Sequence, residues 1–241
     1  MDHRKSRIEL AAAFRLTARE GMHEGVANHF SLAVNDDGTR FLINPKKHFG
    51  LMRASDLWVI DANDPDSAQG TDAPDPTAWG LHASLHRHVP HARCAMHVHS
   101  TYATVLASLA DSRLPAIDQN SAMFYNRQVI DENYGGLALE EEGVRCARLF
   151  QDPSVRTMIM GNHGVLFIGE TVAETFMRMY YFERAARNYI IALSTGRPLR
   201  ELPHDVAEFT ARQLEGDSKA EQDVLDGMRA TLDAEGLDYA A

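Results

Sequence analysis

Residues 92–99 alternate between apolar and polar side chains, a pattern that a β-strand satisfies and a helix does not. The even positions carry Ala, Cys, Met and Val, whereas His97 and His99 fall together on the opposite face. Two imidazoles at the end of one strand lie close enough to bind one metal ion. The same pattern also occurs in histidine pairs that lie at a surface or are half-buried without a metal, so this pair alone leaves both interpretations open.

The other hydrophobic patterns predict a mixed α/β protein. Apolar residues recur at helical spacing or alternate in short runs separated by turn residues such as Asn35-Asp36-Asp37-Gly38. We expect helices over about 4–20, 77–89, 100–110, 139–150 and 171–196, with Thr77 as the cap of the second, and strands over 30–34, 41–43, 57–60, 92–99, 158–160 and 165–167. Residues 61–76 read as an internal loop, and the final forty residues as one or two polar helices with a frayed tail.

Composition excludes several classes of protein. The 241 residues include 24 Lys+Arg and 34 Asp+Glu, a net charge of −10, which disfavours nucleic acid as a partner. No run approaches the roughly 18 apolar residues of a membrane helix, and the first residues lack the apolar core of a signal peptide, so we expect a cytoplasmic protein with no membrane partner. The two cysteines, Cys94 and Cys146, cannot build a disulfide framework.

A third histidine strengthens the metal hypothesis. His163 stands between two short strands, flanked by Asn162 and Gly164, where a glycine lets the backbone approach a site closely. Three imidazoles with open coordination positions are typical of a catalytic metal site. Four further histidines lie within or just after the 77–89 helix and form a rival set: His82, His86, His88 and His91. We expect them to lie on the helix surface or beside the site. His82 is the one most open to a functional role.

Four short motifs resemble the class II aldolase/adducin superfamily. They are Gly80-Leu81-His82, the His-Val-Pro-His-Ala run at 88–92, Ala-Met-His-Val-His-Ser at 95–100 and Gly-Asn-His-Gly-Val at 161–165. The resemblance covers residues 5–200 and implies a single α/β domain over 1–241, three-layered α/β/α around a mostly antiparallel sheet, with a C-terminal helical extension at 201–241. It also implies a homo-oligomer, usually a tetramer with active sites between subunits.

The resemblance assigns ligands and shows where this chain departs from the family. It implies that His97, His99 and His163 bind a divalent metal, most often zinc, with manganese or iron as alternatives. The sugar-phosphate aldolases carry a glutamate acid/base where this chain has Ala78, and their phosphate-binding residues correspond here to Pro76, Thr77 and the Asn28-His29 pair. We therefore expect a small, non-phosphorylated carboxylic or hydroxy-carbonyl substrate.

Other residues must then bind the substrate and move protons. Three neutral imidazoles leave a metal ion its positive charge, which favours an anionic substrate. Asn28 with Lys46 and Lys47 could hold a carboxylate, although both lysines could equally be solvated loop residues. The proton could be moved by water or by the side chains of His29, Tyr125 or Tyr134, although the tyrosines could also serve as packing residues.

Three functions remain open at this point. Within the superfamily, the chain most resembles the adducin-like bacterial branch, which includes aromatic-acid decarboxylating proteins and non-haem iron oxygenases. The residues that carry this resemblance are Asp118-Gln119, Phe124-Tyr125, Tyr134-Gly135-Gly136 and Glu183-Arg184. The first hypothesis is a metal-dependent lyase that performs retro-aldol cleavage or decarboxylation. The alternatives are a three-histidine Fe(II) oxygenase and a non-catalytic adducin-like interaction module.

Overall fold

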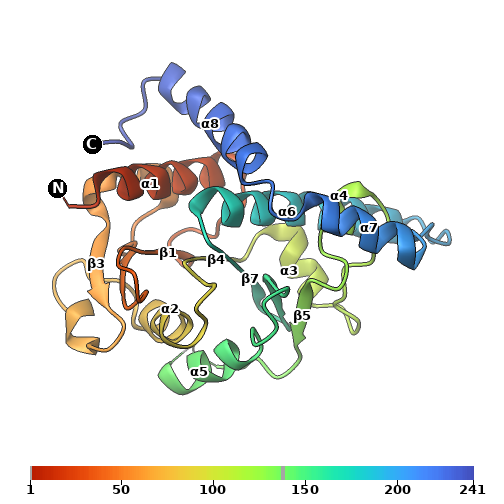
Figure 1. Ribbon diagram of the computed structural model, residues 1–241, viewed down its shortest axis with the longest axis horizontal. Coiled ribbons are helices and arrows are strands. Elements are labelled where there is room, and N and C mark those ends of the chain that lie inside the picture. The colour runs from red at the N-terminus through yellow and green to blue at the C-terminus, as the bar shows by residue number, and fades with distance from the viewer. Residues whose placement is uncertain (1, 137–138) are drawn as a thin grey trace.

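A seven-stranded β-sheet forms the centre of the computed structural model, which describes residues 2–136 and 139–241 (Figure 1). The strand order is β3-β2-β1-β4-β7-β6-β5. Neighbouring strands run antiparallel, apart from the parallel pair β5 and β6. The bounds are β1 (His29–Ala33), β2 (Arg40–Ile43), β3 (Trp58–Asp61), β4 (Cys94–Val98), β5 (Gln128–Asp131), β6 (Thr157–Met160) and β7 (Gly164–Gly169). The predicted mostly antiparallel sheet is confirmed.

Helices cover both faces of this sheet, which confirms the three-layer α/β/α class. In Figure 1, α2 (Pro76–His88) and α5 (Glu140–Arg148) lie below the sheet. Above it lie α1 (Arg4–Arg19) and α6 (Val172–Ser194), with α8 (Ser218–Ala234) packed across them. The remaining elements are α3 (Thr101–Ala107), α4 (Gln119–Ala122), α7 (His204–Leu214) and the 3₁₀ turns η1 (Phe49–Leu51), η2 (Ala54–Asp56) and η3 (Pro65–Ala68).

The alternation within β4 produces two separate cores. Met96 joins the upper core with Phe14 of α1 and Phe176 of α6, whereas Ala95 joins the lower core with Leu81 of α2. Burying a large apolar side chain such as Phe14 stabilises the fold by roughly 1.5–3 kcal/mol. The two cores therefore hold β4 rigidly between them, and the strand carries His97 to its end.

Three local predictions were wrong. Strand β5 and the short helix α4 lie between residues 110 and 139, where the sequence patterns predicted neither a helix nor a strand. Asp75, and not Thr77, caps α2, because the Asp75 carboxylate accepts a hydrogen bond from the Thr77 backbone N at 2.9 Å. The C-terminal tail is not frayed, since Tyr239 is buried and Asp238 pairs with Arg15 at 2.7 Å.

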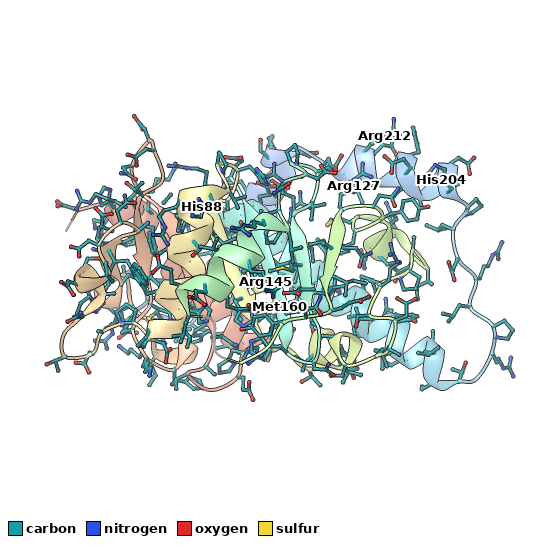
Figure 2. All side chains as sticks on the ribbon, turned by 90° about the horizontal axis from the view of Figure 1, so that it is seen from below. His88, Arg127, Arg145, Met160, His204 and Arg212 are labelled. Atoms are coloured by element: carbon teal, nitrogen blue, oxygen red, sulfur yellow. The ribbon has the colours of Figure 1, made fainter. Side chains whose placement is uncertain are left out.

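Residues 201–241 form α7 and α8, and α7 is fastened to the sheet by a buried arginine. Arg127, which precedes β5, donates hydrogen bonds to Glu208 at 2.5 Å and Glu215 at 2.7 Å. Figure 2 shows Arg127 beside α7, the helix that carries His204 and Arg212. The helices in the described part of the chain are too short or too polar to span a lipid bilayer.

Candidate metal centre

The structure brings together the three histidines that the sequence suggested as metal ligands. His97 lies in β4, His99 directly after it, and His163 in the turn between β6 and β7. Because β7 pairs with β4, this turn lies beside the end of β4. The Nε2 atom of His97 is 2.9 Å from that of His99 and 3.2 Å from that of His163, and the latter two are 3.1 Å apart.

The β6–β7 turn depends on two special backbone positions. Asn162 adopts a left-handed conformation with φ of 56°, and its backbone N donates to the carbonyl of Ala107 at 2.8 Å. A Cβ atom on Gly164 would lie 2.5 Å from the Val98 carbonyl oxygen and 2.7 Å from the His99 ring. A side chain at position 164 is therefore excluded, and the glycine allows the three rings to converge.

The hydrogen-bond partners of Nδ1 in His97 and His99 show which ring nitrogen carries the proton. Nδ1 of His97 is 3.1 Å from the Val165 carbonyl oxygen, and Nδ1 of His99 is 2.5 Å from Oε2 of Glu24. Both oxygens are acceptors, so each ring carries its proton on Nδ1 and turns the Nε2 lone pair towards the other ring. Two lone pairs 2.9 Å apart repel each other, and a shared cation relieves that repulsion.

Burial keeps His97 and His163 in the neutral form that metal binding requires. Desolvation, followed by the neighbouring His29 and His99, holds the pKa of His97 well below its usual value. Desolvation, followed by His99, lowers the pKa of His163 to about 4. These three residues thus fit a divalent ion, with Zn–N bonds of about 2.0–2.1 Å and coordination positions left for a substrate.

A second group of potential ligands is less suited to a metal. Asp131, Glu142 and Cys146 also lie close together, but Arg145 donates hydrogen bonds to both carboxylates. Desolvation raises the pKa of the Cys146 thiol to about 12, so it stays protonated at neutral pH. We assign this group to the ion pair that joins α5 to β5.

A cavity of about 310 Å³ opens in front of the three histidines, and we call it the metal cavity. Its wall contains seven of the nine residues that the sequence analysis selected, together with Ala78 and Asp75 at the start of α2. The seven are Asn28, His29, Lys46, His97, His99, Tyr134 and His163.

Two of the three predicted substrate-binding residues reach this cavity. Asn28 is 1% exposed; its Oδ1 accepts a hydrogen bond from the Glu24 backbone, while its Nδ2 has no partner among the described residues. The Nζ of Lys46 is 2.6 Å from Oδ2 of Asp75, so its charge is balanced within the cavity wall. Lys47 pairs with Asp56 at 2.6 Å and is not part of the wall.

Two of the three predicted proton carriers also reach it. His29 lies opposite His97 in the β1–β4 register, and burial lowers its pKa to about 3. The ring of Tyr134 stacks on His163 with centroids 4.4 Å apart, and burial raises its pKa to about 12. Tyr125 lies elsewhere in this chain, where its hydroxyl contacts Nδ1 of His204 on α7 at 2.9 Å.

The histidines of α2 do not form a rival metal site. His82 and His86 are buried beneath the sheet, not on the helix surface, and both ring nitrogens of His82 are engaged, by His29 and by Ser31. His88 lies at the exposed end of α2 (Figure 2), and His91 is partly buried.

Three polar residues near the metal cavity were not predicted from the sequence: Glu24, Ser31 and Asp75. Asp75 precedes Pro76 at a helix start, a pattern that predicts an N-cap and could have identified it. Ser31 alternates with apolar residues in β1, which placed it on the inner face without indicating a partner. Glu24 lies in an irregular loop, and no local pattern indicates its contact with His99.

Comparisons with known proteins agree with this geometry. The family model described as "Class II Aldolase and Adducin N-terminal domain" matches residues 8–190. Decarboxylase NovR of Streptomyces niveus is 26% identical over 207 residues, which cover 85% of this chain and 75% of that protein. The 4-hydroxy-3-prenylphenylpyruvate oxygenase/4-hydroxy-3-prenylbenzoate synthase of Streptomyces roseochromogenus subsp. oscitans is 25% identical over 207 residues, covering 85% and 73%. An aldolase II superfamily protein from Pseudomonas syringae shares the fold, with a TM-score of 0.88 and 24% identity, covering 99% of this chain and 96% of that one.

Proposed function

Because the chain belongs to the class II aldolase and adducin family, we propose that it is a divalent-metal-dependent lyase acting on a small, non-phosphorylated carboxylic or hydroxy-carbonyl compound. The reaction is a retro-aldol cleavage or a decarboxylation. The observation that carries the proposal is the convergence of three imidazoles, through Nε2, on one side of an open cavity. Zinc, a homotetramer with sites between subunits, and a cytoplasmic location belong to the same proposal.

His97, His99 and His163 would hold the metal ion. When bound, such an ion polarises a carbonyl or carboxylate oxygen and stabilises negative charge as a carbon–carbon bond breaks. Hydrogen bonds from Nδ1 to Val165 and Glu24 orient two of the rings, so their Nε2 atoms are fixed before any ion binds.

Asn28 and Lys46 are the proposed contacts for the substrate's oxygen atoms. The unpartnered, buried Nδ2 of Asn28 is a donor that an oxygen of the substrate can satisfy, and leaving such a group without a partner costs about 1–3 kcal/mol. Lys46 can bind a carboxylate by exchanging its contact with Asp75 for one with the substrate. Lys47 has no part in this proposal, because it pairs with Asp56 outside the cavity wall.

His29 and Tyr134 are the proposed proton carriers. The carbon that retains the electron pair of the broken bond needs a proton, and Ala78, fully buried in the cavity wall, cannot supply it. At neutral pH, Tyr134 stays protonated because its pKa is raised to about 12, so it can donate a proton or a hydrogen bond. His29 is uncharged there and can accept or donate through its ring nitrogens.

A second candidate is a three-histidine Fe(II) oxygenase. Two observations favour it: three imidazoles leave open coordination positions, and one relative is described as an oxygenase. The two candidates differ in their need for oxygen. A lyase turns over without oxygen, whereas an oxygenase consumes it in proportion to product.

Metal analysis and a substrate panel test the proposal. Untagged protein and the His88→Ala control are expected to contain a single zinc, manganese or iron ion per chain, and His97→Ala none. Aromatic and aliphatic 2-oxo and 2-hydroxy acids are then incubated anaerobically, and released CO₂ or aldehyde is measured by mass spectrometry. Anaerobic product supports the lyase, and product formed only with iron and oxygen supports the oxygenase. Wild-type protein that binds no added metal contradicts both and leaves an adducin-like interaction module.

A further inference from the structure

Helix α3, which begins two residues after His99, receives its N-terminal cap from another helix. The side chain of Ser100, its own N-cap residue, makes no hydrogen bond to the backbone of α3. Glu183 on α6 takes that role: its Oε1 accepts a hydrogen bond from the Tyr102 backbone N, and its Oε2 accepts one from that of Ala103, both at 2.9 Å. Oε2 also accepts a hydrogen bond from the Ser100 hydroxyl at 2.7 Å. One carboxylate thus satisfies three donors that lie at least 80 positions earlier in the chain.

The short length of α3 makes this cap important. The helix has seven residues, and isolated helices of fewer than about 12 residues are unstable in water. The first N–H groups of a helix have no partner within it, so the N-terminus depends on an external acceptor. Ala103 and Leu106 are buried and pack α3 into the upper core, but they lie after its first two residues. Glu183 is therefore the contact that fixes the start of α3.

Helix α3 links two segments that carry metal ligands. At its start, Ser100 directly follows His99, which lies one residue beyond β4. At its end, the carbonyl of Ala107 accepts a hydrogen bond from the Asn162 backbone N at 2.8 Å. Asn162 directly precedes His163 and has a left-handed backbone, so this bond fixes the turn from which His163 projects. A displacement of α3 would therefore move both ligand segments.

The three donors require a carboxylate at position 183. The two arginines closest in sequence along α6 are directed at aromatic rings. Arg184 lies over Tyr180, 5.5 Å from the ring centroid, and Arg187 lies over Tyr102 at 5.7 Å. The negative charge of Glu183 instead faces the N–H groups of α3, where the helix dipole favours an anion. A glutamine would offer a single acceptor oxygen, and its NH₂ group would meet a backbone donor.

We propose that Glu183 is a positioning residue of the metal centre, which fixes the relative position of His99 and His163 through α3. Glu183 touches neither the metal ion nor the substrate. Its action differs from that of Glu24, which contacts the His99 ring directly, because Glu183 fixes the backbone from which the two ligands project. This inference rests on the proposed function, since the spacing of the two ligands sets their affinity for a shared ion.

Amide hydrogen exchange of the apoprotein, followed by NMR, tests the coupling without metal or substrate. In Glu183→Gln, the amides of Tyr102 and Ala103 should exchange faster, because they lose acceptors. If Glu183 acts through the whole of α3, the Asn162 amide at the far end should also exchange at least about tenfold faster than in the wild type. Wild-type protection of Asn162 in this variant would restrict Glu183 to a local cap and overturn the proposal.

Glu174→Gln is the matched control, because it removes a second capping carboxylate from the same helix. Oε2 of Glu174 accepts a hydrogen bond from the Glu170 backbone N at 2.7 Å, and Oε1 accepts one from Nη2 of Arg178 at 3.2 Å. In the described part of the chain, Glu174 makes no hydrogen bond to α3 and does not line the metal cavity. We expect wild-type exchange at Asn162 in this variant. An effect equal to that of Glu183→Gln would indicate a general loosening of α6 and would also overturn the proposal.

Zinc affinity measures the consequence for the metal centre. By competition with a zinc-binding dye, we expect the zinc Kd of Glu183→Gln to rise about tenfold and that of Glu174→Gln to stay at the wild-type value. A Kd within twofold of the wild type in folded Glu183→Gln overturns the positioning role, even where the free energy of unfolding falls. If Glu183→Gln does not fold, Ser100→Ala, which loses one of the three hydrogen bonds, replaces it in both measurements, with the Kd expected to rise about threefold. Wild-type protein that binds no zinc removes the proposed function, and the Asn162 amide still decides whether Glu183 fixes the His163 turn.

Discussion

Removing the Glu24 carboxylate should weaken metal binding although Glu24 is not a ligand. Its Oε2 accepts a hydrogen bond from Nδ1 of His99 at 2.5 Å, which orients the ring and increases electron density on Nε2. Glu24→Ala removes both effects. Glu24→Gln keeps a neutral acceptor at the same position, so it should fall between Glu24→Ala and the wild type.

The size of the effect follows from how exposed this contact is. Partners of this kind typically change metal affinity about 10- to 100-fold. The Glu24 side chain is 65% exposed, so water screens its charge and the lower end applies. We expect the zinc Kd of Glu24→Ala to rise about tenfold, equivalent to about 1.4 kcal/mol, and that of Glu24→Gln to rise about threefold.

Competition with a zinc-binding dye at fixed pH and salt measures these Kd values. Glu20→Gln is the matched control, because Glu20 is an exposed carboxylate at the end of α1 that does not contact the metal cavity. A Kd for Glu24→Ala within twofold of the wild type would refute the role of this hydrogen bond. An equal loss in Glu20→Gln would show a general electrostatic effect instead.

Three further predictions concern the turn, the buried histidines and the cavity wall. Gly164→Ala places a Cβ 2.5 Å from the Val98 carbonyl oxygen, so we expect the free energy of unfolding to fall by about 1–3 kcal/mol and bound metal to be lost. Denaturant titration and elemental analysis measure the two effects. The control Gly227→Ala, where a Cβ meets no atom within 4 Å, should lose neither. Burial lowers the pKa of His86 in the folded protein to about 3, so below about pH 6.5 the unfolded chain binds one more proton than the folded one. The free energy of unfolding of the apoprotein should therefore fall as pH falls from 6.5 towards 3. His86→Phe should reduce the slope of unfolding free energy against pH by up to about 1.4 kcal/mol per pH unit. Ala78→Glu adds a carboxylate to the metal cavity and should weaken oxalate binding to the zinc-loaded protein in calorimetry; unchanged affinity would contradict an electropositive site.

Periodicity was enough to predict the central strands and the main helices. The alternation in 92–99 places His97 and His99 on one face of β4, since a strand has a period of two whatever surrounds it. The motif around His163 predicts a turn because its glycine is needed where two strands approach closely. These inferences succeed because each depends on neighbours in the chain.

Tertiary contacts explain what the sequence analysis missed. Strand β5 has four residues, three of them only partly buried, and it exists because Gln128–Asp131 pairs with β6 across a long connection. Glu24 meets His99 across 75 positions, and His82 meets His29 across 53. No local pattern reports such contacts, and the same limit applies to Tyr125, whose partner His204 lies on α7.

The substitution at Ala78 links the charge of the site to its proton supply. Lys46 and Asp75 cancel in the cavity wall, and Glu24 lies behind His99, so three neutral imidazoles would leave a divalent ion its full charge towards the cavity. That charge favours an anionic substrate more strongly than a site with a carboxylate ligand does. The same absence of a carboxylate removes a proton carrier, and the nearest groups able to replace it are neutral ones, Tyr134 and His29.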